Sequence, residues 1–201
     1  MIKAIIFDFG GVFRNEASRV LFSEIENKFQ INREQLFKGF KGVFEPYERG
    51  KISDQEAWQK FSQNIGKNLP AGYEALWTDK YISGERIDEK MLALVPVLKQ
   101  RGFRVALLSN TLPPHAQYNK DQKRYDLFDE VVLSSDVGMA KPDKEIYHFM
   151  LNKLGMAADE CIFVDDKPAN VKTANEIGMK GIIFLSYEDL LEKFKEFEIE
   201  I

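Results

Sequence analysis

A chain of 201 residues, 44% of them hydrophobic and 30% charged, has the composition of an ordinary globular protein and can bury one substantial core. The formal net charge of −4 gives no cationic surplus, and no cluster of lysines and arginines is interleaved with aromatic residues, so we expect no nucleic-acid partner. The apolar run before Asp8 is too short for a signal-peptide core or a membrane span, so we expect a cytoplasmic protein that does not enter a membrane.

The first predicted element is a buried strand that ends in a carboxylate and two glycines. Residues Ala4–Phe7 form the unbroken apolar run typical of a strand covered on both faces, which places Asp8 at its carboxyl end. Open α/β sheets bind ligands at that end, and Gly10 and Gly11 let the backbone turn and bring its N–H groups close to an anion. On these residues alone, Asp8 is equally well a nucleophile or an aspartate that caps the next turn.

Residues 17–81 show helical periodicity and no convincing strand, which predicts an all-helical insertion. Apolar side chains recur at helical spacing in four groups: Leu21, Ile25 and Phe29; Leu36, Phe40, Phe44 and Tyr47; Ala57, Trp58, Phe61 and Ile65; and Tyr73, Leu76 and Trp77. Asn32 with Gln35 and Ser53 with Glu56 are cap signals for the second and third helices, and Gly50 ends the second. We expect most of these aromatic residues in the core of a helical bundle.

Strands and helices alternate from residue 88 onwards. Strands are expected at residues 105–108, 130–134, 161–164 and 181–185, and helices at 91–101, 142–154, 171–177 and from 187. This alternation predicts an α/β fold with a doubly wound, parallel, Rossmann-like sheet. Residues 1–14 and 86–201 then form the core, and residues 15–85 form the inserted helical part. The single cysteine, Cys161, opens a strand and is expected to be a buried structural thiol.

Polar residues follow several of the predicted strands. The carboxyl ends of parallel strands meet at one edge, so Asp8, Ser109 and the pair Asp165–Asp166 are expected to converge. Three carboxylates repel one another unless a cation lies between them, and a set of oxygen ligands suits a hard ion such as Mg²⁺. Such an ion attracts phosphate, to which the Ser109 hydroxyl and the following N–H groups can donate. Lys141, at the start of a helix, adds positive charge where anions are already favoured.

These residues make the sequence resemble the haloacid dehalogenase-like hydrolase superfamily over essentially the whole chain. The four family motifs stand in order as Phe7-Asp8-Phe9-Gly10-Gly11-Val12, Leu108-Ser109-Asn110-Thr111, Gly138-Met139-Ala140-Lys141-Pro142, and Phe163-Val164-Asp165-Asp166 with Asn170. The stretch Glu48-Arg49-Gly50-Lys51-Ile52-Ser53, with the second and third motifs, is similar to the branch that contains α-D-glucose-1-phosphate phosphatases. The resemblance implies that the helical insertion is a small cap that closes over the site.

The resemblance also implies an activity and a set of residue roles. We expect a Mg²⁺-dependent phosphatase that hydrolyses a small phosphorylated metabolite, such as glucose 1-phosphate, through an aspartyl-phosphate intermediate. In the implied mechanism Asp8 is the nucleophile, and the metal ligands are Asp8, the Gly10 carbonyl and Asp166. The groups that hold and neutralise the phosphoryl oxygens are Ser109, Asn110 and Lys141. Asp165 supports the metal ligands or contacts the metal through a water molecule, and Asn170 supports the metal site. The expected partner is a small phosphoester, and the expected state is a monomer or a homodimer.

One position departs from the family pattern. Most phosphatases of the family carry a second aspartate two residues after the nucleophile, where it protonates the leaving alcohol, and Gly10 stands in that place here. General acid catalysis typically raises the reaction rate by about 10²- to 10⁴-fold. A sugar 1-phosphate depends less on such an acid, because its leaving group is a stabilised hemiacetal alkoxide. Glu45, Glu48, His115 and a bound water are candidates for the replacement acid.

Two other functions remain open at this point. A 2-haloacid dehalogenase needs no Mg²⁺ and has a bulkier side chain in place of Gly10, whereas the pair Asp165–Asp166 favours a metal. A scaffold that binds a phosphorylated ligand without turnover would explain the missing acid. Side chains that set specificity are not identified by periodicity, and the candidates for the pocket lining are Arg14, Phe44, Arg49 and Trp58.

Overall fold

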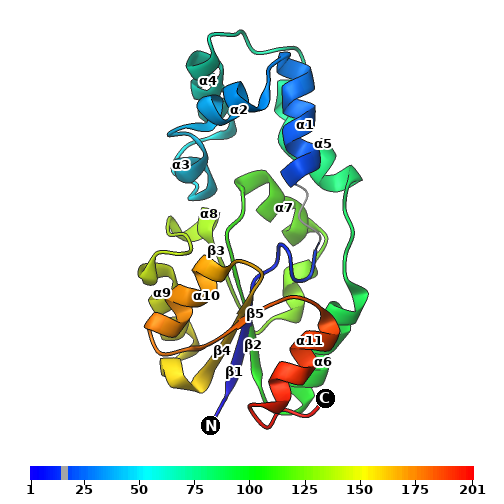
Figure 1. Ribbon diagram of the computed structural model, residues 1–201, viewed down its shortest axis with the longest axis vertical. Coiled ribbons are helices and arrows are strands. Elements are labelled where there is room, and N and C mark those ends of the chain that lie inside the picture. The colour runs from blue at the N-terminus through cyan, green and yellow to red at the C-terminus, as the bar shows by residue number, and fades with distance from the viewer. Residues whose placement is uncertain (15–17) are drawn as a thin grey trace.

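A five-stranded parallel sheet organises the computed structural model, which describes residues 1–14 and 18–201. The strands are β1 (Ala4–Phe7), β2 (Arg104–Ser109), β3 (Glu130–Leu133), β4 (Cys161–Asp165) and β5 (Lys180–Ile183), in the order β3-β2-β1-β4-β5 (Figure 1). The chain winds outward from β1 in both directions, so the predicted doubly wound α/β fold is confirmed. The reversal of direction at β1 creates the crevice where such sheets bind ligands.

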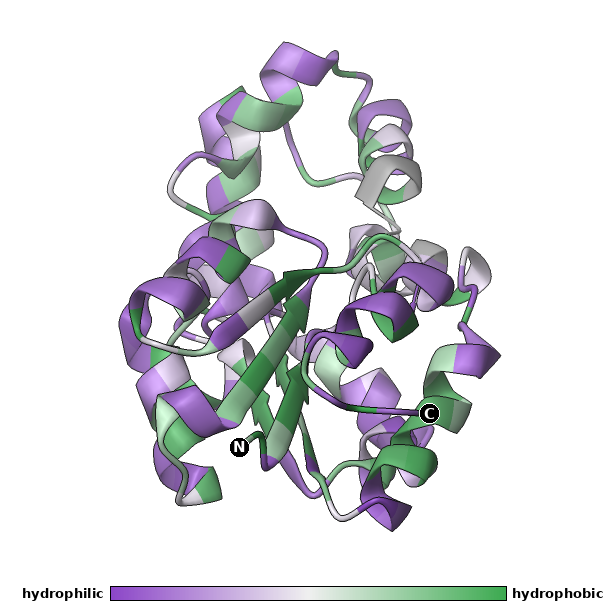
Figure 2. Cartoon of the chain, turned by 60° about the horizontal axis from the view of Figure 1, so that its bottom comes forward, coloured by the Kyte–Doolittle hydropathy of each residue, from purple (hydrophilic) through white to green (hydrophobic). Residues whose placement is uncertain are grey.

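Strand β1 is buried on both faces because its side chains alternate between two hydrophobic layers. Ile5 and Phe7 pack with helices α6 (Glu89–Gln100) and α11 (Tyr187–Lys195), whereas Ala4 and Ile6 pack with α9 (Lys144–Leu154) and α10 (Pro168–Glu176). Figure 2 shows the hydrophobic strands lying between these two helical layers. The strand is therefore held firmly from both sides up to Asp8.

The helices inserted after β1 lie beyond the carboxyl ends of the strands (Figure 1). They are α1 (Ser18–Phe29), α2 (Arg33–Phe40), α3 (Phe44–Glu48), α4 (Asp54–Ile65), a 3₁₀ turn at Tyr73–Ala75, and α5 (Leu76–Ser83). Both expected capping boxes, at Asn32 and Ser53, are present. Ala17, where the helical part was predicted to begin, lies outside the described residues.

The inserted helices have their own hydrophobic core. Trp58 is fully buried there, with its ring centroid 4.6 Å from that of Trp77 and stacked 5.6 Å from that of Phe29. The prediction of Trp58 as a pocket-lining residue is therefore wrong. Its large ring fills the centre of the helical core, where it buries more apolar surface than a position at a polar site would allow.

The predicted single helix from Asn32 to Gly50 is also wrong. Helix α2 ends at Phe40 and α3 starts at Phe44, with Gly42 between them at a φ of +69°. A backbone in this left-handed conformation cannot continue an α-helix, and glycine adopts it without steric cost. The break turns α3 towards the sheet.

Other elements differ from the prediction mainly at their ends. Ser134 begins the short helix α8 (Ser134–Val137) instead of ending β3, α9 starts at Lys144, α10 starts at Pro168, and β5 covers Lys180–Ile183. Helix α7 (Pro113–Asp121) and a 3₁₀ turn at Arg124–Leu127 were not predicted. Helices α3 and α5 of the insertion pack against α8 and α7 respectively.

Cys161 is fully buried, as expected, and burial raises the pKa of its thiol to about 12. Within residues 1–14 and 18–201, no helix combines the length and the apolar character needed to cross a bilayer. The cytoplasmic location stays a prediction.

Candidate active site

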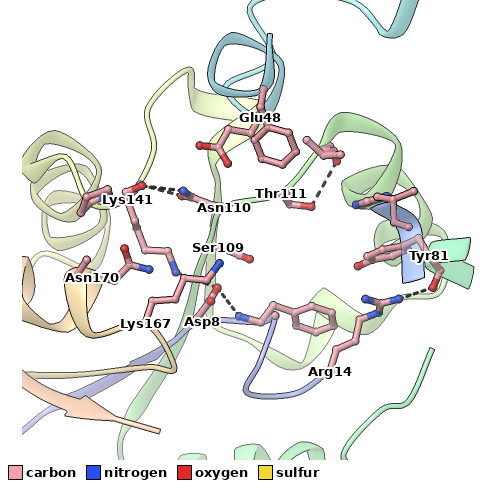
Figure 3. A pocket seen from close by; sticks show the side chains of 18 of the residues that line it. Asp8, Arg14, Glu48, Tyr81, Ser109, Asn110, Thr111, Lys141, Lys167 and Asn170 are labelled. Carbon is pink, nitrogen blue, oxygen red and sulfur yellow. Dashed lines mark hydrogen bonds and ion pairs between the residues drawn. The ribbon is translucent and has the colours of Figure 1, made fainter. Parts of the chain in front are cut away.

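The predicted site residues come together at the carboxyl edge of the sheet. Asp8 directly follows β1, Ser109 ends β2 and Asp165 ends β4. Asp8, Asp165 and Asp166 each offer a carboxylate oxygen, and these three atoms lie within 4.8 Å of one another. This edge opens into a pocket of about 440 Å³. Figure 3 shows side chains that line the pocket.

Lys141 lies between two of the carboxylates. Its Nζ is 2.9 Å from Asp8 Oδ1 and 2.6 Å from Asp165 Oδ2, and its side chain is completely buried. Burial raises the pKa of the Asp8 carboxyl, Lys141 opposes this shift, and the negative charge of Asp165 adds to it. The positive charge of Lys141 therefore balances only part of the negative charge that Asp8, Asp165 and Asp166 carry when ionised.

Asp165 is held in place by three hydrogen bonds besides the one from Lys141. The Asn170 amide donates to both oxygens, at 3.1 and 2.9 Å, and the backbone N–H of Lys167 donates to Oδ1 at 2.8 Å. Asn170 thus connects the start of α10 to the end of β4, and its support of a metal site stays a prediction. With both oxygens already accepting, Asp165 is placed to support its neighbours, and Asp166 is the acid of the pair nearer the turn at Gly11.

The Asn110 side chain forms a reciprocal pair with the backbone of Lys141. Its Nδ2 donates to the Lys141 carbonyl and its Oδ1 accepts from the Lys141 N–H, both at 2.8 Å (Figure 3). The side chain therefore positions Lys141. Ser109, which is nearly buried, lines the pocket beside it. The phosphate contacts expected of Ser109, Asn110 and Lys141 stay predictions.

The two glycines after Asp8 differ in their surroundings. A Cβ built at Gly11, whose φ is +81°, would lie 2.4 Å from both Cγ and Oδ2 of Asp166. A Cβ built at Gly10 would meet nothing within 4 Å. Gly11 therefore leaves the space that the Asp166 carboxylate fills, whereas the position of the missing family aspartate, at Gly10, is open.

The acidic cluster fits a magnesium ion. All its side-chain donors are oxygen atoms, which is the set that Mg²⁺ prefers, and several carboxylates close together need a cation. The predicted ligands Asp8, Gly10 and Asp166 are neighbours at the turn after β1, where Asp166 fills the space beside Gly11.

The upper part of the pocket is lined by the inserted helices. Leu21, Phe22, Phe44 and Tyr81 face it, so Phe44 is confirmed as a lining residue. The prediction of Arg49 in the lining is wrong, because its Nη2 forms an ion pair with Asp143 Oδ2 at 2.5 Å.

Arg14 also lines the pocket, as predicted, and links the chain after β1 to the end of α5. Its guanidinium lies 3.5 Å from the centroid of the Tyr81 ring, and its Nε is 3.3 Å from Glu85 Oε1. Arg124 contacts both oxygens of Glu85 at 2.5 Å. This partly buried network fixes the base of the helical insertion.

The three residues considered as replacement acids lie in different surroundings. Glu45 carries an exposed side chain paired with Arg49 at 3.0 Å. His115 lines the pocket, but its Nε2 lies 2.5 Å from the Trp77 carbonyl, and burial lowers its pKa to about 4. A carbonyl only accepts, so neutral His115 carries its proton on Nε2 and has none on Nδ1 to give. Glu48 lines the pocket, and burial raises the pKa of its carboxyl.

Comparison with known proteins agrees with this geometry. The sequence model of the haloacid dehalogenase-like hydrolase family matches residues 2–178. The chain belongs to this family. The sesquiterpene phosphatase astK of Aspergillus oryzae is 35% identical, over 90% of this chain and 88% of its own length. The D-ribitol-5-phosphate phosphatase of Bacteroides thetaiotaomicron is 28% identical, over 90% of each chain.

A solved structure supports the fold of this haloacid dehalogenase-like hydrolase. It is that of a HAD family enzyme from Bacteroides thetaiotaomicron in complex with magnesium and inorganic phosphate, with a TM-score of 0.75, 27% identity, and coverage of 94% of this chain and 99% of the other. The predicted superfamily and enzyme class are thereby confirmed, with phosphatases among the relatives. The closer resemblance to glucose-1-phosphate phosphatases stays a prediction.

Sequence reasoning missed Lys167 in this hydrolase. The residue lines the pocket, and its side chain extends beside Asp8 (Figure 3). Its position directly after the pair Asp165–Asp166 was a signal that could have identified it. Tyr81 was read only as the end of the helical stretch, and nothing in its local sequence indicates its contact with Arg14.

Proposed function

We propose that this haloacid dehalogenase-like hydrolase is a Mg²⁺-dependent phosphatase that hydrolyses a small phosphorylated metabolite through an aspartyl phosphate. The observation that supports the proposal most strongly is that Asp8, Lys141 and Asp166, from three distant parts of the chain, come together at one edge of the sheet, where Asp8 and Lys141 line a pocket. In this proposal residues 15–85 form a cap over the core of residues 1–14 and 86–201. The protein acts as a monomer or a homodimer.

The proposed reaction uses residues that the sheet holds in position. An Asp8 oxygen attacks phosphorus, and the rigid strand below it limits the loss of freedom in reaching that geometry. Lys141 lies 2.9 Å from Asp8 and supplies positive charge to the phosphoryl oxygens, to which the Ser109 hydroxyl and the Asn110 N–H donate. Mg²⁺ held by Asp8, the Gly10 carbonyl and Asp166, with Asp165 and Asn170 supporting the site, would neutralise phosphoryl charge.

Two substrate classes are consistent with the pocket. Its volume of about 440 Å³ is in the range of sites for small metabolites. A sugar 1-phosphate is the first candidate, because its leaving alkoxide is stabilised. A phosphate ester of an apolar alcohol is the second, because Leu21, Phe22 and Phe44 give the outer pocket an apolar wall, and because the similar astK protein is a sesquiterpene phosphatase.

The test is a phosphate-release screen with and without Mg²⁺, on the wild type and on Asp8→Asn. Glucose 1-phosphate and farnesyl phosphate represent the two candidate substrate classes, and ribitol 5-phosphate is added because a similar protein is a D-ribitol-5-phosphate phosphatase. We expect turnover that requires both the metal and Asp8. Full turnover by Asp8→Asn would show that the covalent route is wrong.

A chloride-release assay and a binding titration, run beside the phosphate screen, separate the two other functions. Turnover of a 2-chloroacid without Mg²⁺ would support the dehalogenase. Tight binding of a phosphoester without hydrolysis of any compound would support the scaffold.

A further inference from the structure

The turn that follows α3, residues Glu48, Arg49 and Gly50, fastens the inserted helices to the sheet. We call these three residues the docking turn. The hydroxyl of the fully buried Ser134 donates to the Glu48 carbonyl at 2.6 Å and accepts from the N–H of Thr111 at 2.9 Å. The backbone of Glu48 is therefore connected through one hydroxyl to the loop that follows Ser109.

The other two residues of the docking turn fix its distance from the core. Gly50 lies so close to α8 that a Cβ there would be 2.2 Å from the Ser135 carbonyl oxygen. Arg49 reaches across to Asp143, which stands two residues after Lys141, at 2.5 Å. These contacts hold Glu48 at a set height above the carboxyl edge of the sheet.

The Glu48 side chain points from this anchored turn into the pocket. Figure 3 shows its carboxyl group directed into the cavity from the side of the inserted helices, across from Asp8. A group leaving phosphorus in line departs on the side opposite the attacking oxygen. An attack by Asp8 therefore sends the leaving oxygen towards Glu48.

The surroundings of Glu48 favour its protonated form. Burial is the largest influence and raises its pKa, and Glu45 adds to this, whereas Lys167, Arg49 and Lys141 oppose it. A carboxyl that keeps its proton closer to neutral pH is a better donor than an exposed one. Exposed Glu45 and the proton-less Nδ1 of His115 do not offer this combination.

We propose that Glu48 is the general acid and base of this enzyme and replaces, from the cap, the aspartate that is absent at Gly10. This proposal rests on the proposed phosphatase function. It assigns the docking turn a direct part in the reaction, because the acid reaches the site only when the turn is seated on Ser134, Ser135 and Asp143.

The proton balance of the two steps is as follows. Asp8 forms a bond to phosphorus, the ester P–O bond breaks, and the leaving oxygen takes its electron pair and the Glu48 proton to become the alcohol. The Glu48 carboxylate then accepts a proton from the water that attacks the aspartyl phosphate. The P–O bond to Asp8 breaks, which releases inorganic phosphate and restores the Asp8 carboxylate and protonated Glu48.

The experiment compares a good and a poor leaving group in Glu48→Gln, a variant that keeps the shape of the side chain. With an alkyl phosphate, we expect kcat/KM to fall by about 10²- to 10⁴-fold, because the alkoxide then leaves without a proton. With p-nitrophenyl phosphate, whose leaving group needs no proton, we expect a stoichiometric burst of p-nitrophenol and then slow turnover. The phosphorylated enzyme accumulates and is visible by intact-protein mass spectrometry, which a purely structural role would not produce.

Three further variants make the result decisive. Glu34→Gln, the same change at an exposed residue of the inserted helix α2 and outside the docking turn, is the matched control and should behave as the wild type. Gly10→Asp in the Glu48→Gln background should restore turnover of the alkyl phosphate, since a side chain at position 10 has room. Asp8→Asn should show no burst with either substrate.

The outcomes separate the two proposals. Equal losses with both leaving groups and no burst, or a rise in KM alone, would show that Glu48 only docks or binds substrate, and would overturn this inference. A persisting burst in Asp8→Asn would instead refute the phosphatase mechanism itself. Thermal unfolding of each variant establishes that it is folded. The pH profile for the alkyl phosphate provides a second test. Glu48→Asp should retain the basic limb of this profile, and Glu48→Gln should lose it.

Discussion

Gly11→Ala tests the inferred magnesium site through one methyl group. The added Cβ would lie 2.4 Å from Asp166 Cγ and Oδ2, more than 1 Å inside the ordinary carbon contact distance of about 3.5 Å. The end of a side chain moves more easily than a backbone, so Asp166 is expected to rotate away from Asp8. Disturbing the groups that position a ligand typically costs about 10- to 100-fold in metal affinity, and we expect a loss of that size.

The same variant also carries a cost in stability. A non-glycine residue at the φ of +81° found at Gly11 is strained by about 1–2 kcal/mol. For a chain of this length, about 1 kcal/mol corresponds to about 2–4 °C in Tm, so the variant should melt about 2–8 °C lower and still fold. The variant therefore stays folded at the temperature of the titration, and its affinity for the metal can be measured separately from its stability.

The assay is a calorimetric Mg²⁺ titration together with a thermal melt. Gly10→Ala is the matched control, because a Cβ at the adjacent position meets nothing within 4 Å and leaves the Gly10 carbonyl intact. We expect the control to bind Mg²⁺ as the wild type does. Wild-type affinity in Gly11→Ala, or equal losses in both variants, would refute the assignment of Asp166 to the metal.

Three further predictions concern the stability and reactivity of the enzyme. Lys141→Met leaves two buried carboxylates without their cation, so the free energy of unfolding should fall by about 3–5 kcal/mol in urea denaturation, and an unchanged midpoint would contradict the pairing. Gly50→Ala brings a Cβ to 2.2 Å from the Ser135 carbonyl and should lower both kcat and Tm, whereas normal kinetics would show that the docking turn has no part in turnover. Cys161, whose thiol pKa is raised to about 12 by burial, should react with Ellman's reagent at pH 8 only in denaturant, and rapid labelling of the native enzyme would show that the strand opens.

The parts of this enzyme that the sequence predicted well are those with strong local signals. The unbroken apolar run Ala4–Phe7 and the capping pairs at Asn32 and Ser53 depend on neighbouring residues only, and all are present as expected. The convergence of Asp8, Asp165 and Asp166 followed from one topological rule, that parallel strands share a carboxyl edge.

The features that were missed depend on contacts between residues far apart in the sequence, on backbone conformation, or on polar side chains that are buried. Helix α7 starts with two prolines and buries the polar residues His115 and Asn119, so it shows no apolar stripe. The break between α2 and α3 depends on the positive φ of Gly42, whereas the apolar spacing continues across it unchanged. Arg14 and Glu85 are 71 residues apart, and periodicity carries no information about such a pair.

The central place of β1 in the sheet has a consequence for biosynthesis. The strand is made first, yet one of its edges pairs with β2 and the other with β4, whose residues Cys161–Asp165 are made much later. A nascent chain that ends before Cys161 therefore carries a hydrophobic strand with an open hydrogen-bonding edge, which is a template for aggregation. Chains truncated ahead of Cys161 should therefore be insoluble, whereas chains that retain β4 cover this edge of β1.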